Sequence, residues 1–535
     1  MAPLHTVITL LGCVYAVAAN SPVVDLGYAK YQGVVDTHLN ITSFRGIRYA
    51  APPVGNLRWQ SATAPSVVGG IQQADADPIQ CFQGVLGGAA TNPLTVRDDP
   101  VQSEDCLFLS VYTPALNSTV PLPTLVWIHG GGYVQGSASQ YNGGELVRES
   151  NNEVVAVVIQ YRLGLFGFLA GEQIKEHGAL NAGLLDQEFA LRWVNQNIHK
   201  FGGDPNEVAI WGQSAGCGGS VLQHVIANDG KTSPPLFRAA MTSSAFLHTQ
   251  YPYNGRIPQT LFNEVAAQAG CSDAEALDCL RAVDSVSLQD VNLNMTAAGF
   301  QGTQKLTCCS LGTITFAPVV DGSFIAQSPT AALAQRKLNG EILLSVTNLN
   351  EGFLFVNQTA NYNVTDYMRN LYPLFGSKES EAAVSLYSSF GSPAAAVTAI
   401  LGESTLVCPT YLLLNAFPGD SYKGQYAIPP SYHGSDVVNY FPSFTAWGEP
   451  IIFNNTDFIN AFTQGFLSFA VNLDPNVKLR PSITPLWQKW SPTYETEMVF
   501  NKTEADAPDI AATTTSGALQ SRCEFWRSVH NLTGQ

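Results

Sequence analysis

The chain has 535 residues, of which 45% are hydrophobic and only 13% are charged, and its formal net charge is −16. This hydrophobic fraction is typical of a globular protein and excludes a disordered chain. The acidic excess argues against nucleic acid and anionic membranes as partners, because both attract Lys and Arg. The 46 glycines and 31 prolines follow no period, which indicates many tight connections rather than a collagen-like chain.

The N-terminus is predicted to be a secretory leader. Residues 7–18 are apolar, and Ala16-Val-Ala18 has the small-x-small pattern of a cleavage site, so we expect residues 1–19 to be removed. Because no Lys or Arg precedes Lys30, a buried N-terminal segment is the alternative. Eight N-x-S/T sequons agree with an extracellular glycoprotein. They are Asn40, Asn117, Asn294, Asn357, Asn363, Asn454, Asn501 and Asn531.

No membrane anchor is expected. The most apolar later stretch, residues 154–170, carries Arg162 near its middle, where hydrocarbon would penalise it by about 2.5–3.5 kcal/mol. The stretch Asn531-Leu-Thr-Gly-Gln535 lacks the hydrophobic tail of a lipid-anchor signal. We therefore expect a soluble, secreted product.

Short apolar runs alternate with helical patterns along the chain. Residues 184–198 have apolar side chains at helix spacing. Strands are predicted at residues 124–128, 154–159, 208–211 and 342–346. This alternation predicts an α/β fold, with a mostly parallel sheet covered by helices on both faces. Residues 250–420 have fewer strand signals and are expected to cap the sheet, so that residues 20–535 form one domain.

A candidate nucleophile follows one of the predicted strands. Gly212-Gln-Ser214-Ala-Gly216 comes directly after residues 208–211. A G-x-S-x-G turn holds its serine on a tight bend between a strand and a helix, and the helix dipole favours negative charge there. An ordinary glycine-rich turn is the alternative.

A second motif, His129-Gly-Gly-Gly-Tyr133, follows the strand predicted at residues 124–128. Successive glycines allow backbone N–H groups to converge on one oxygen, which is how an oxyanion hole is built. The expected donors are the amides of Gly131, Gly132 and Ala215. A flexible loop or a phosphate cradle is the alternative, but no G-K-[ST] follows to hold a nucleotide. The two motifs together are far more specific than either one alone.

The base is found by elimination. In the chain order of α/β hydrolases, the histidine follows both the serine and the acid. The histidines after Ser214 are His224, His248, His433 and His530. His224 lies on the helix expected after the serine, His248 precedes every plausible acid at a strand end, and His530 is almost at the C-terminus. His433, in a loop with Gly and Ser, is therefore the candidate.

Two carboxylates could serve as the acid. Glu351 comes just after the strand predicted at residues 342–346, and Asp321 follows another apolar run. Position in the sequence favours Glu351 over Asp321 as the acid by about two to one. For either residue the non-catalytic alternative is a solvated carboxylate in a turn.

With these motifs, the sequence resembles a known family, the type-B carboxylesterases and lipases, which include the cholinesterases. Phe201 to Gly216 is similar to their active-serine signature, and Glu104 to Pro114 to their second signature. The segments Phe44 to Pro53 and Asn181 to Gln187 are similar to two further blocks. The resemblance spans about residues 23–526 and implies an α/β-hydrolase fold. Within the family, the sequence most resembles the secreted fungal esterases.

The resemblance also implies roles for individual residues. It makes Ser214 the nucleophile, Glu351 the acid and His433 the base, and it assigns Asp321 to a block that is not catalytic. It requires no metal or organic cofactor. The implied disulfides are Cys81–Cys106, Cys271–Cys279 and Cys408–Cys523, which leaves Cys217, Cys308 and Cys309 without a partner.

The sequence departs from the family pattern in three respects, and these departures favour simple small-molecule carboxylesters as substrates. Residues 82–105 hold no Trp or Tyr that could stack on a choline cation, so choline esters are not expected. Gly312 and Ile314 stand where cholinesterases carry bulky aromatics, which predicts room for acyl groups longer than acetyl. The same short loop offers no wide apolar face for a lipase lid, which favours simple carboxylesters.

Two other functions remain as alternatives. A lipase or sterol-ester esterase of the same family would act on long-chain esters. A non-catalytic, cholinesterase-like binding module would lack a member of the Ser-His-Glu set, whereas all three are present here. The oligomeric state is not predicted.

Overall fold

The structure is a computed structural model that describes residues 21–85, 101–116, 120–271, 274–301, 315–417, 421–444 and 452–535. The predicted leader, residues 1–19, lies outside these ranges. So do Asn117, Cys308, Cys309, Gly312 and Ile314. The side chains of residues 217–218 and 297–301 are not described either, and Cys217 is among them.

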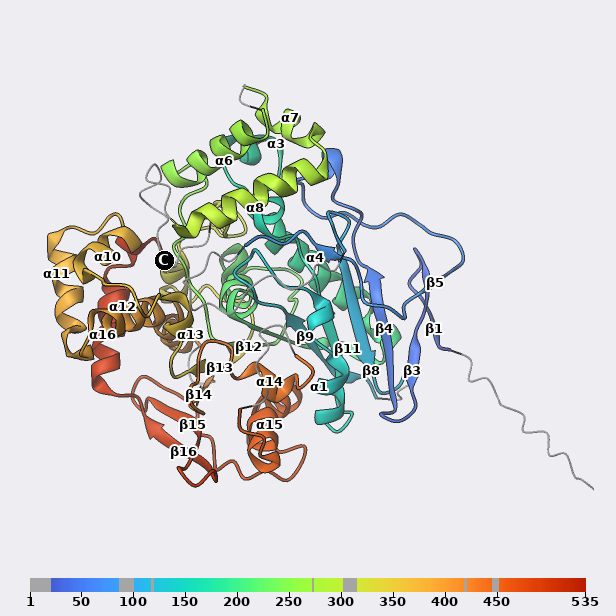
Figure 1. The fold of residues 1–535 in the computed structure, drawn as a ribbon. Helices are drawn as coiled ribbons and strands as arrows, with labels where there is room; N and C mark the ends of the chain where they lie inside the picture. The colour runs from blue at the N-terminus through green and yellow to red at the C-terminus, as the bar shows by residue number, and fades with distance from the viewer. Residues whose placement is uncertain are drawn as a thin grey trace, which may run out of the picture.

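A large sheet runs through the molecule (Figure 1). Within the described residues it has eleven strands, in the order β16-β15-β14-β13-β12-β11-β9-β10-β8-β4-β3. All neighbours from β15 to β10 in this order pair in parallel, and the outer pairs are antiparallel. The strands are β3 (Val34–Asp36), β4 (Ile41–Arg48), β8 (Phe108–Thr113), β9 (Leu122–Ile128), β10 (Val155–Ile159), β11 (Gly203–Gln213), β12 (Ala239–Ser243), β13 (Ile342–Asn348), β14 (Ser421–Tyr426), β15 (Thr496–Lys502) and β16 (Pro508–Thr514).

Two small sheets lie beside the main one. One has the order β1-β2-β5, and the other pairs β6 with β7. Their strands are β1 (Val23–Asp25), β2 (Lys30–Gln32), β5 (Ile71–Gln73), β6 (Gln80–Cys81) and β7 (Gln102–Ser103).

Helices cover both faces of the main sheet, as predicted. Along β9, Val126 and Ile128 belong to one hydrophobic core, whereas Leu125 and Trp127 belong to the other. Successive side chains of a strand point to opposite faces, so a run of apolar residues has to be buried on both sides. The first core includes side chains of α4 (Ala182–Asn197) and α13 (Cys408–Ala416), and the second those of α1 (Gly143–Glu149) and α15 (Thr456–Asn472). The predicted fold class is confirmed.

The predicted elements are found with small shifts at their ends. The helix expected at residues 184–198 is α4, and the strand expected at residues 208–211 is the end of the longer β11, whose register with β9 shifts between Gly203 and Val208. The described parts of residues 250–420 are mainly helical. The helices α10 (Val364–Leu371), α11 (Ser377–Leu386), α12 (Pro393–Gly402) and α16 (Gly517–Ser528) share a core of their own at one end of the sheet (Figure 1). The remaining helices are α2 (Gly164–Phe168), α3 (Glu172–His177), α5 (Leu222–Ile226), α6 (Arg256–Gln268), α7 (Ala276–Ala282), α8 (Ser285–Gln301), α9 (Pro329–Ala334), α14 (Val437–Tyr440) and α17 (His530–Thr533).

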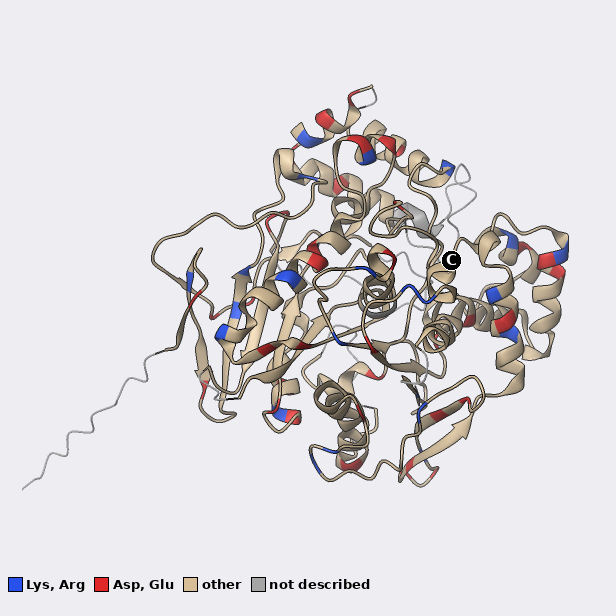
Figure 2. Cartoon of the chain, turned by 180° about the vertical axis from the view of Figure 1, so that it is seen from behind, with Lys and Arg blue, Asp and Glu red and all other residues tan. Residues whose placement is uncertain are grey.

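Among the described residues, one helical stretch, Pro393–Ala416, is long and apolar enough to cross a bilayer. In its apolar window 72% of the residues are buried inside the protein, as in the core helix of a globular protein. The charged residues lie mostly on the outer elements, with Lys and Arg interspersed among Asp and Glu rather than gathered by sign (Figure 2).

Candidate active site

The connections of the central strands diverge on either side of β9. The chain passes from β9 to β10 on one side and then returns to β11 on the other side of β9. Loops that leave the carboxyl ends of such strands diverge, and ligands bind between them. The two glycine motifs follow β9 and β11, and therefore both lie where these loops diverge.

Ser214 stands at the end of β11 with a left-handed backbone, at a φ of 59°. The flanking glycines lie directly against β9, since a Cβ on Gly212 would come within 2.5 Å of the carbonyl oxygen of Ile128. A Cβ on Gly216 would clash with the same carbonyl. Only glycine therefore allows this close approach, which is the geometry expected of a nucleophile elbow.

The segment after Ser214 differs from the regular helix that we expected. It begins as a 3-10 turn over residues 214–216 and continues as a π-helical turn over residues 217–221 before α5 begins. π-helical turns are rare and occur often at functional sites. His224 lies on α5, as predicted.

The loop after β9 adjoins Ser214. Gly131 and Gly132 have positive φ values of 107° and 63°, which glycine adopts at no steric cost. A Cβ on Gly130 would stand 3.2 Å from the Cβ of Ser214. The three expected oxyanion donors therefore lie on two segments that meet at the serine: Gly131 and Gly132 on one, and Ala215 on the other.

Glu351 and His433 are brought together by the parallel pairing of β13 with β14. Beyond the strands, Asn350 still pairs with Tyr432 in an isolated bridge, so the next residue on each segment is Glu351 or His433. The Nδ1 atom of His433 lies 2.6 Å from the Oε2 atom of Glu351, and both side chains are buried. Because an ionised carboxylate only accepts hydrogen bonds, Nδ1 carries the proton.

A second layer of hydrogen bonds holds the carboxylate. The backbone amide of Asn348 donates to Oε1 of Glu351 at 2.7 Å, and the Asn348 side chain donates to Asp436 at 2.9 Å. Asp436 also accepts from the hydroxyl of Tyr440 at 2.7 Å. Burial raises the pKa of Asp436, although the hydrogen bonds from Asn348 and Tyr440 oppose this. The carboxylate of Glu351 is therefore held by the backbone of its own turn and by His433, and Asn348 links that turn to Asp436.

The side chain of Gln213 contacts the other ring nitrogen of His433. Its Nε2 lies 3.1 Å from the Nε2 of His433, and its side chain is almost completely buried. An amide nitrogen only donates, so the Nε2 of His433 accepts and the ring has the tautomer that a general base requires. Sequence reasoning missed this residue, although its place beside Ser214 in the G-x-S-x-G motif was an available signal.

Two of the candidates set aside in the sequence analysis, His224 and Asp321, have other partners. The Nε2 of His224 lies 3.1 Å from the Oε1 of Gln187, and burial lowers the pKa of His224 to about 3. Asp321 accepts hydrogen bonds from Asn181 at 2.6 Å and from Ser323 at 2.8 Å. Across the described ranges, no group of three or more His, Cys, Asp or Glu side chains is arranged to hold a metal ion.

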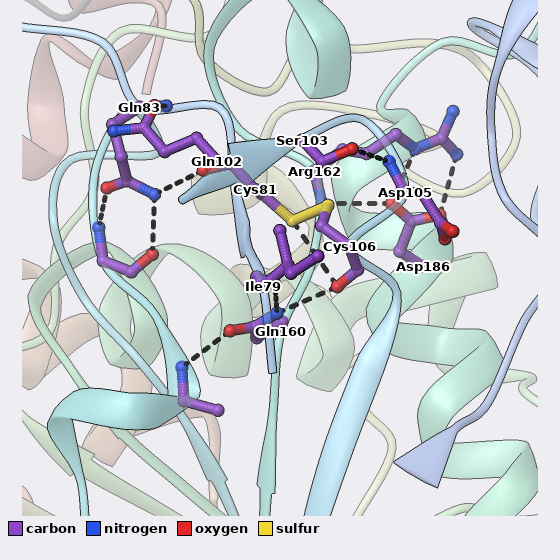
Figure 3. Close-up of a disulfide and its surroundings, with 12 residues drawn as sticks. Ile79, Cys81, Gln83, Gln102, Ser103, Asp105, Cys106, Gln160, Arg162 and Asp186 are labelled. Carbon is purple, nitrogen blue, oxygen red and sulfur yellow. Dashed lines mark hydrogen bonds and ion pairs between the residues drawn. A yellow bond between two sulfur atoms is a disulfide. The ribbon is translucent and has the colours of Figure 1, made fainter. Parts of the chain in front are cut away.

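The structure contains the three implied disulfides, Cys81–Cys106, Cys271–Cys279 and Cys408–Cys523. The Gln160 side chain donates to the carbonyl of Cys106 at 2.9 Å (Figure 3). On the other side of this bridge, Gln83 bonds to both the amide and the carbonyl of Gly136. The first disulfide is thereby tied to the loop that follows β9.

The sequence matches the model of the Carboxylesterase family over residues 20–526. The chain belongs to the Carboxylesterase family. It is 29% identical to carboxylesterase patB of Aspergillus clavatus, over 98% of this chain and 99% of that protein. It is 30% identical to the secreted triacylglycerol lipase LIP1 of Gibberella zeae, over 82% of this chain and 80% of that protein.

A solved structure agrees with this membership. Aspergillus niger EstA superposes with a TM-score of 0.84 at 28% sequence identity, and the match covers 96% of this chain and 99% of that one. The resemblance to type-B carboxylesterases and lipases is therefore confirmed, together with the α/β-hydrolase fold. Membership of the Carboxylesterase family makes the protein a carboxylic ester hydrolase.

Proposed function

We propose that the protein is a secreted serine carboxylesterase in which Ser214 is the nucleophile, His433 the base and Glu351 the acid. The observation that carries this proposal is the 2.6 Å contact between His433 and Glu351, together with the 3.1 Å contact of His433 with Gln213, the residue directly before Ser214. His433 carries its proton on Nδ1, so its unprotonated Nε2 can take a proton, as a general base does.

In the proposed reaction, Oγ of Ser214 attacks the ester carbonyl carbon while His433 Nε2 takes the hydroxyl proton. The hydroxyl has to replace the Gln213 amide at that nitrogen for this step. The amides of Gly131, Gly132 and Ala215 donate to the oxyanion of the tetrahedral intermediate. His433 returns the proton to the leaving alkoxide, and water then cleaves the acyl-enzyme with the same base. These steps involve no cofactor.

Secretion is supported by the predicted leader, by the sequons and by relatives such as the secreted lipase of Gibberella zeae. Asn40, Asn294, Asn363, Asn454 and Asn531 are exposed, and Asn357 and Asn501 are half-buried. Exposed sequons are accessible to the glycosylation machinery of the secretory pathway. We propose a glycosylated extracellular enzyme.

We propose simple carboxylesters as the substrates, although the relatives include lipases as well as carboxylesterases. The segment between Cys81 and Cys106 is short and offers little room for a lipase lid helix. A simple esterase hydrolyses dissolved esters, whereas interfacial activation requires a lid that opens on a lipid surface.

The test compares p-nitrophenyl butyrate and tributyrin across their solubility limits. We expect the rate to saturate below the limit with no jump above it. Ser214→Ala should lower kcat by at least about 10⁴-fold and leave the thermal unfolding midpoint unchanged. Turnover retained by the variant would contradict the nucleophile. A rate jump at saturation would favour the lipase alternative, and a native protein without turnover would favour a binding module.

A further inference from the structure

A buried positive charge lies in the strand that leads to His433. Lys423, in the middle of β14, is completely buried, and it is the only buried lysine among the residues that the structure describes. Its Nζ atom lies 3.3 Å from Oε2 of Glu497 on β15, donates to Oγ1 of Thr347 on β13 at 2.9 Å, and also donates to the carbonyl of Gly424. An ammonium has three N–H donors, and three oxygens surround this one. The surroundings of Lys423 are therefore those of a charged lysine.

Stability alone does not account for this charge. Replacing a buried ion pair by apolar side chains of similar size is often neutral or stabilising, because both charges lose their hydration on burial. Burial lowers the pKa of Lys423, and the carboxylates of Glu497 and Glu351 oppose this shift. Burial and Glu497 raise the pKa of Tyr411, so the phenol that faces Lys423 from α13 is neutral. Glu495 is a like charge beside Glu497 and does not replace the cation.

Thr347 connects Lys423 to the turn that carries Glu351. Thr347 is almost completely buried, and its hydroxyl is the group on β13 that Lys423 binds. The peptide bond that follows Thr347 presents the amide of Asn348, which donates to Oε1 of Glu351 at 2.7 Å. Lys423 thus fixes the residue whose peptide unit holds the Glu351 carboxylate. The attraction between the ammonium and this carboxylate acts in the same sense.

The ion pair is oriented with respect to the active site. β14 lies between β13 and β15 in the sheet, so the ammonium is on the strand next to that of Glu351, and the carboxylate of Glu497 is one strand further away (Figure 1). Around Glu351, the ionisable partners are His433 and Asp436, and the carboxylates of Asp436 and Glu351 repel each other. A cation on the side of β13 compensates for this repulsion.

We propose that Lys423 is a positioning residue of the active site: through Thr347 and by its charge, it holds the Glu351 carboxylate in the place and in the ionised form that His433 requires. This role rests on the proposed function, in which Glu351 is the acid.

The first test removes the whole ion pair. Lys423→Met/Glu497→Met leaves no charge unpaired, so the thermal unfolding midpoint should be close to native. We expect kcat for p-nitrophenyl butyrate to fall by about tenfold. The acid limb of the kcat/KM profile should move up by about half a pH unit, because a cation near the pair of Glu351 and His433 disfavours protonation of the ring. A native acid limb in the folded variant would overturn the proposal.

The matched control is Arg238→Met/Glu207→Met. It removes an ion pair with an N–O distance of 2.9 Å between the amino-terminal parts of β11 and β12, away from the strand ends that carry the active site. Its acid limb should be native. An equal shift in the control would also overturn the proposal, since any lost ion pair would then have the same effect.

A second test leaves both charges in place. Thr347→Val removes the hydroxyl that Lys423 binds with little change of shape, whereas Thr347→Ser keeps a hydroxyl. We expect kcat to fall by about tenfold in Thr347→Val and to stay near the native value in Thr347→Ser. KM should be unchanged in both, because Thr347 positions the acid and not the substrate. Equal kcat values in the two variants would overturn the link through Thr347.

A third measurement does not depend on turnover. The Nδ1 proton of His433, which lies in the 2.6 Å contact with Glu351, can be followed by ¹H NMR. We expect its resonance to move upfield in Lys423→Met/Glu497→Met and in Thr347→Val, because the contact lengthens, and to stay in place in Thr347→Ser. A native resonance in all three would overturn the proposal even if the protein hydrolyses esters. The predicted shifts in a protein without esterase activity would support the positioning role and contradict the proposed function.

Discussion

At the scale of single residues, both nitrogens of His433 are held before any substrate binds. Glu351 accepts from Nδ1 at 2.6 Å, and the Gln213 amide donates to Nε2 at 3.1 Å. The ring is therefore fixed in orientation and in tautomer, which spares the reaction the cost of ordering it. Gln213 is neutral, so it adds no charge to the base that has to accept a proton from Ser214.

A charge at position 213 should change the pH dependence of the enzyme. In Gln213→Glu, a carboxylate beside Nε2 would stabilise the protonated ring of His433. We expect the acid limb of the kcat/KM profile to move up by about one pH unit, with the activity near neutral pH falling accordingly. The measurement is kcat/KM for p-nitrophenyl butyrate from pH 5 to pH 9.

The matched control is Gln213→Met, which has a similar shape but neither charge nor amide. It should leave the acid limb in place, whatever it does to kcat. If the two variants have superimposable pH profiles, Gln213 does not act on the base.

At the scale of elements, the position of Glu351 depends on how the end of β13 packs against α12. Gly352 follows Glu351 directly, and a Cβ there would overlap the carbonyl oxygen of Thr398 and come within 2.9 Å of the amide nitrogen of Gly402. These are backbone atoms of a helix, which cannot move aside as a flexible side chain can. The helix thus holds the turn that carries the acid.

Gly352→Ala should therefore displace Glu351. Because a displacement of about 1 Å in an active site can cost about 100-fold in rate, we expect kcat for p-nitrophenyl butyrate to fall by about 10- to 100-fold. Gly69→Ala is the control, since a Cβ at Gly69 meets nothing within 4 Å. Native kcat in a folded Gly352→Ala protein would show that this packing does not position the acid.

At the scale of the whole molecule, burial keeps several histidines neutral. Burial lowers the pKa of His129 to about 4 and the pKa values of His224 and His248 to about 3. Unfolded histidine titrates near pH 6.5, so between pH 6.5 and about 3 the unfolded state binds more protons. Their contribution to stability is complete above pH 6.5 and is lost as the pH falls through this window.

His224→Gln should weaken this acid sensitivity. One such histidine steepens the dependence of the unfolding free energy on pH by up to about 1.4 kcal/mol per pH unit. We expect the slope measured by urea unfolding between pH 6 and pH 4 to fall by up to that amount in the variant. His177→Gln, at an exposed position, should keep the native slope. Equal slopes in both variants would contradict a neutral buried His224.

The parts of this architecture that the sequence predicts are those written in local patterns. The strand before the three glycines, the strand before Ser214 and the strand before Glu351 are apolar runs, and each ends in a recognisable turn. β14 escaped prediction because it carries Lys423 in the middle, and that lysine is buried against Glu497 of β15 at 3.3 Å. The contact of Gln213 with His433 joins residues 220 positions apart, so no local pattern contains it.

The central claim is that Ser214 is activated by His433, and covalent labelling tests it most directly. A fluorophosphonate reacts with a serine whose hydroxyl proton is taken by a neighbouring base. We predict one adduct per chain, mapped by peptide mass spectrometry to the peptide that contains Ser214, and no adduct in His433→Ala. An adduct on another serine, or labelling that survives His433→Ala at the native rate, would contradict it.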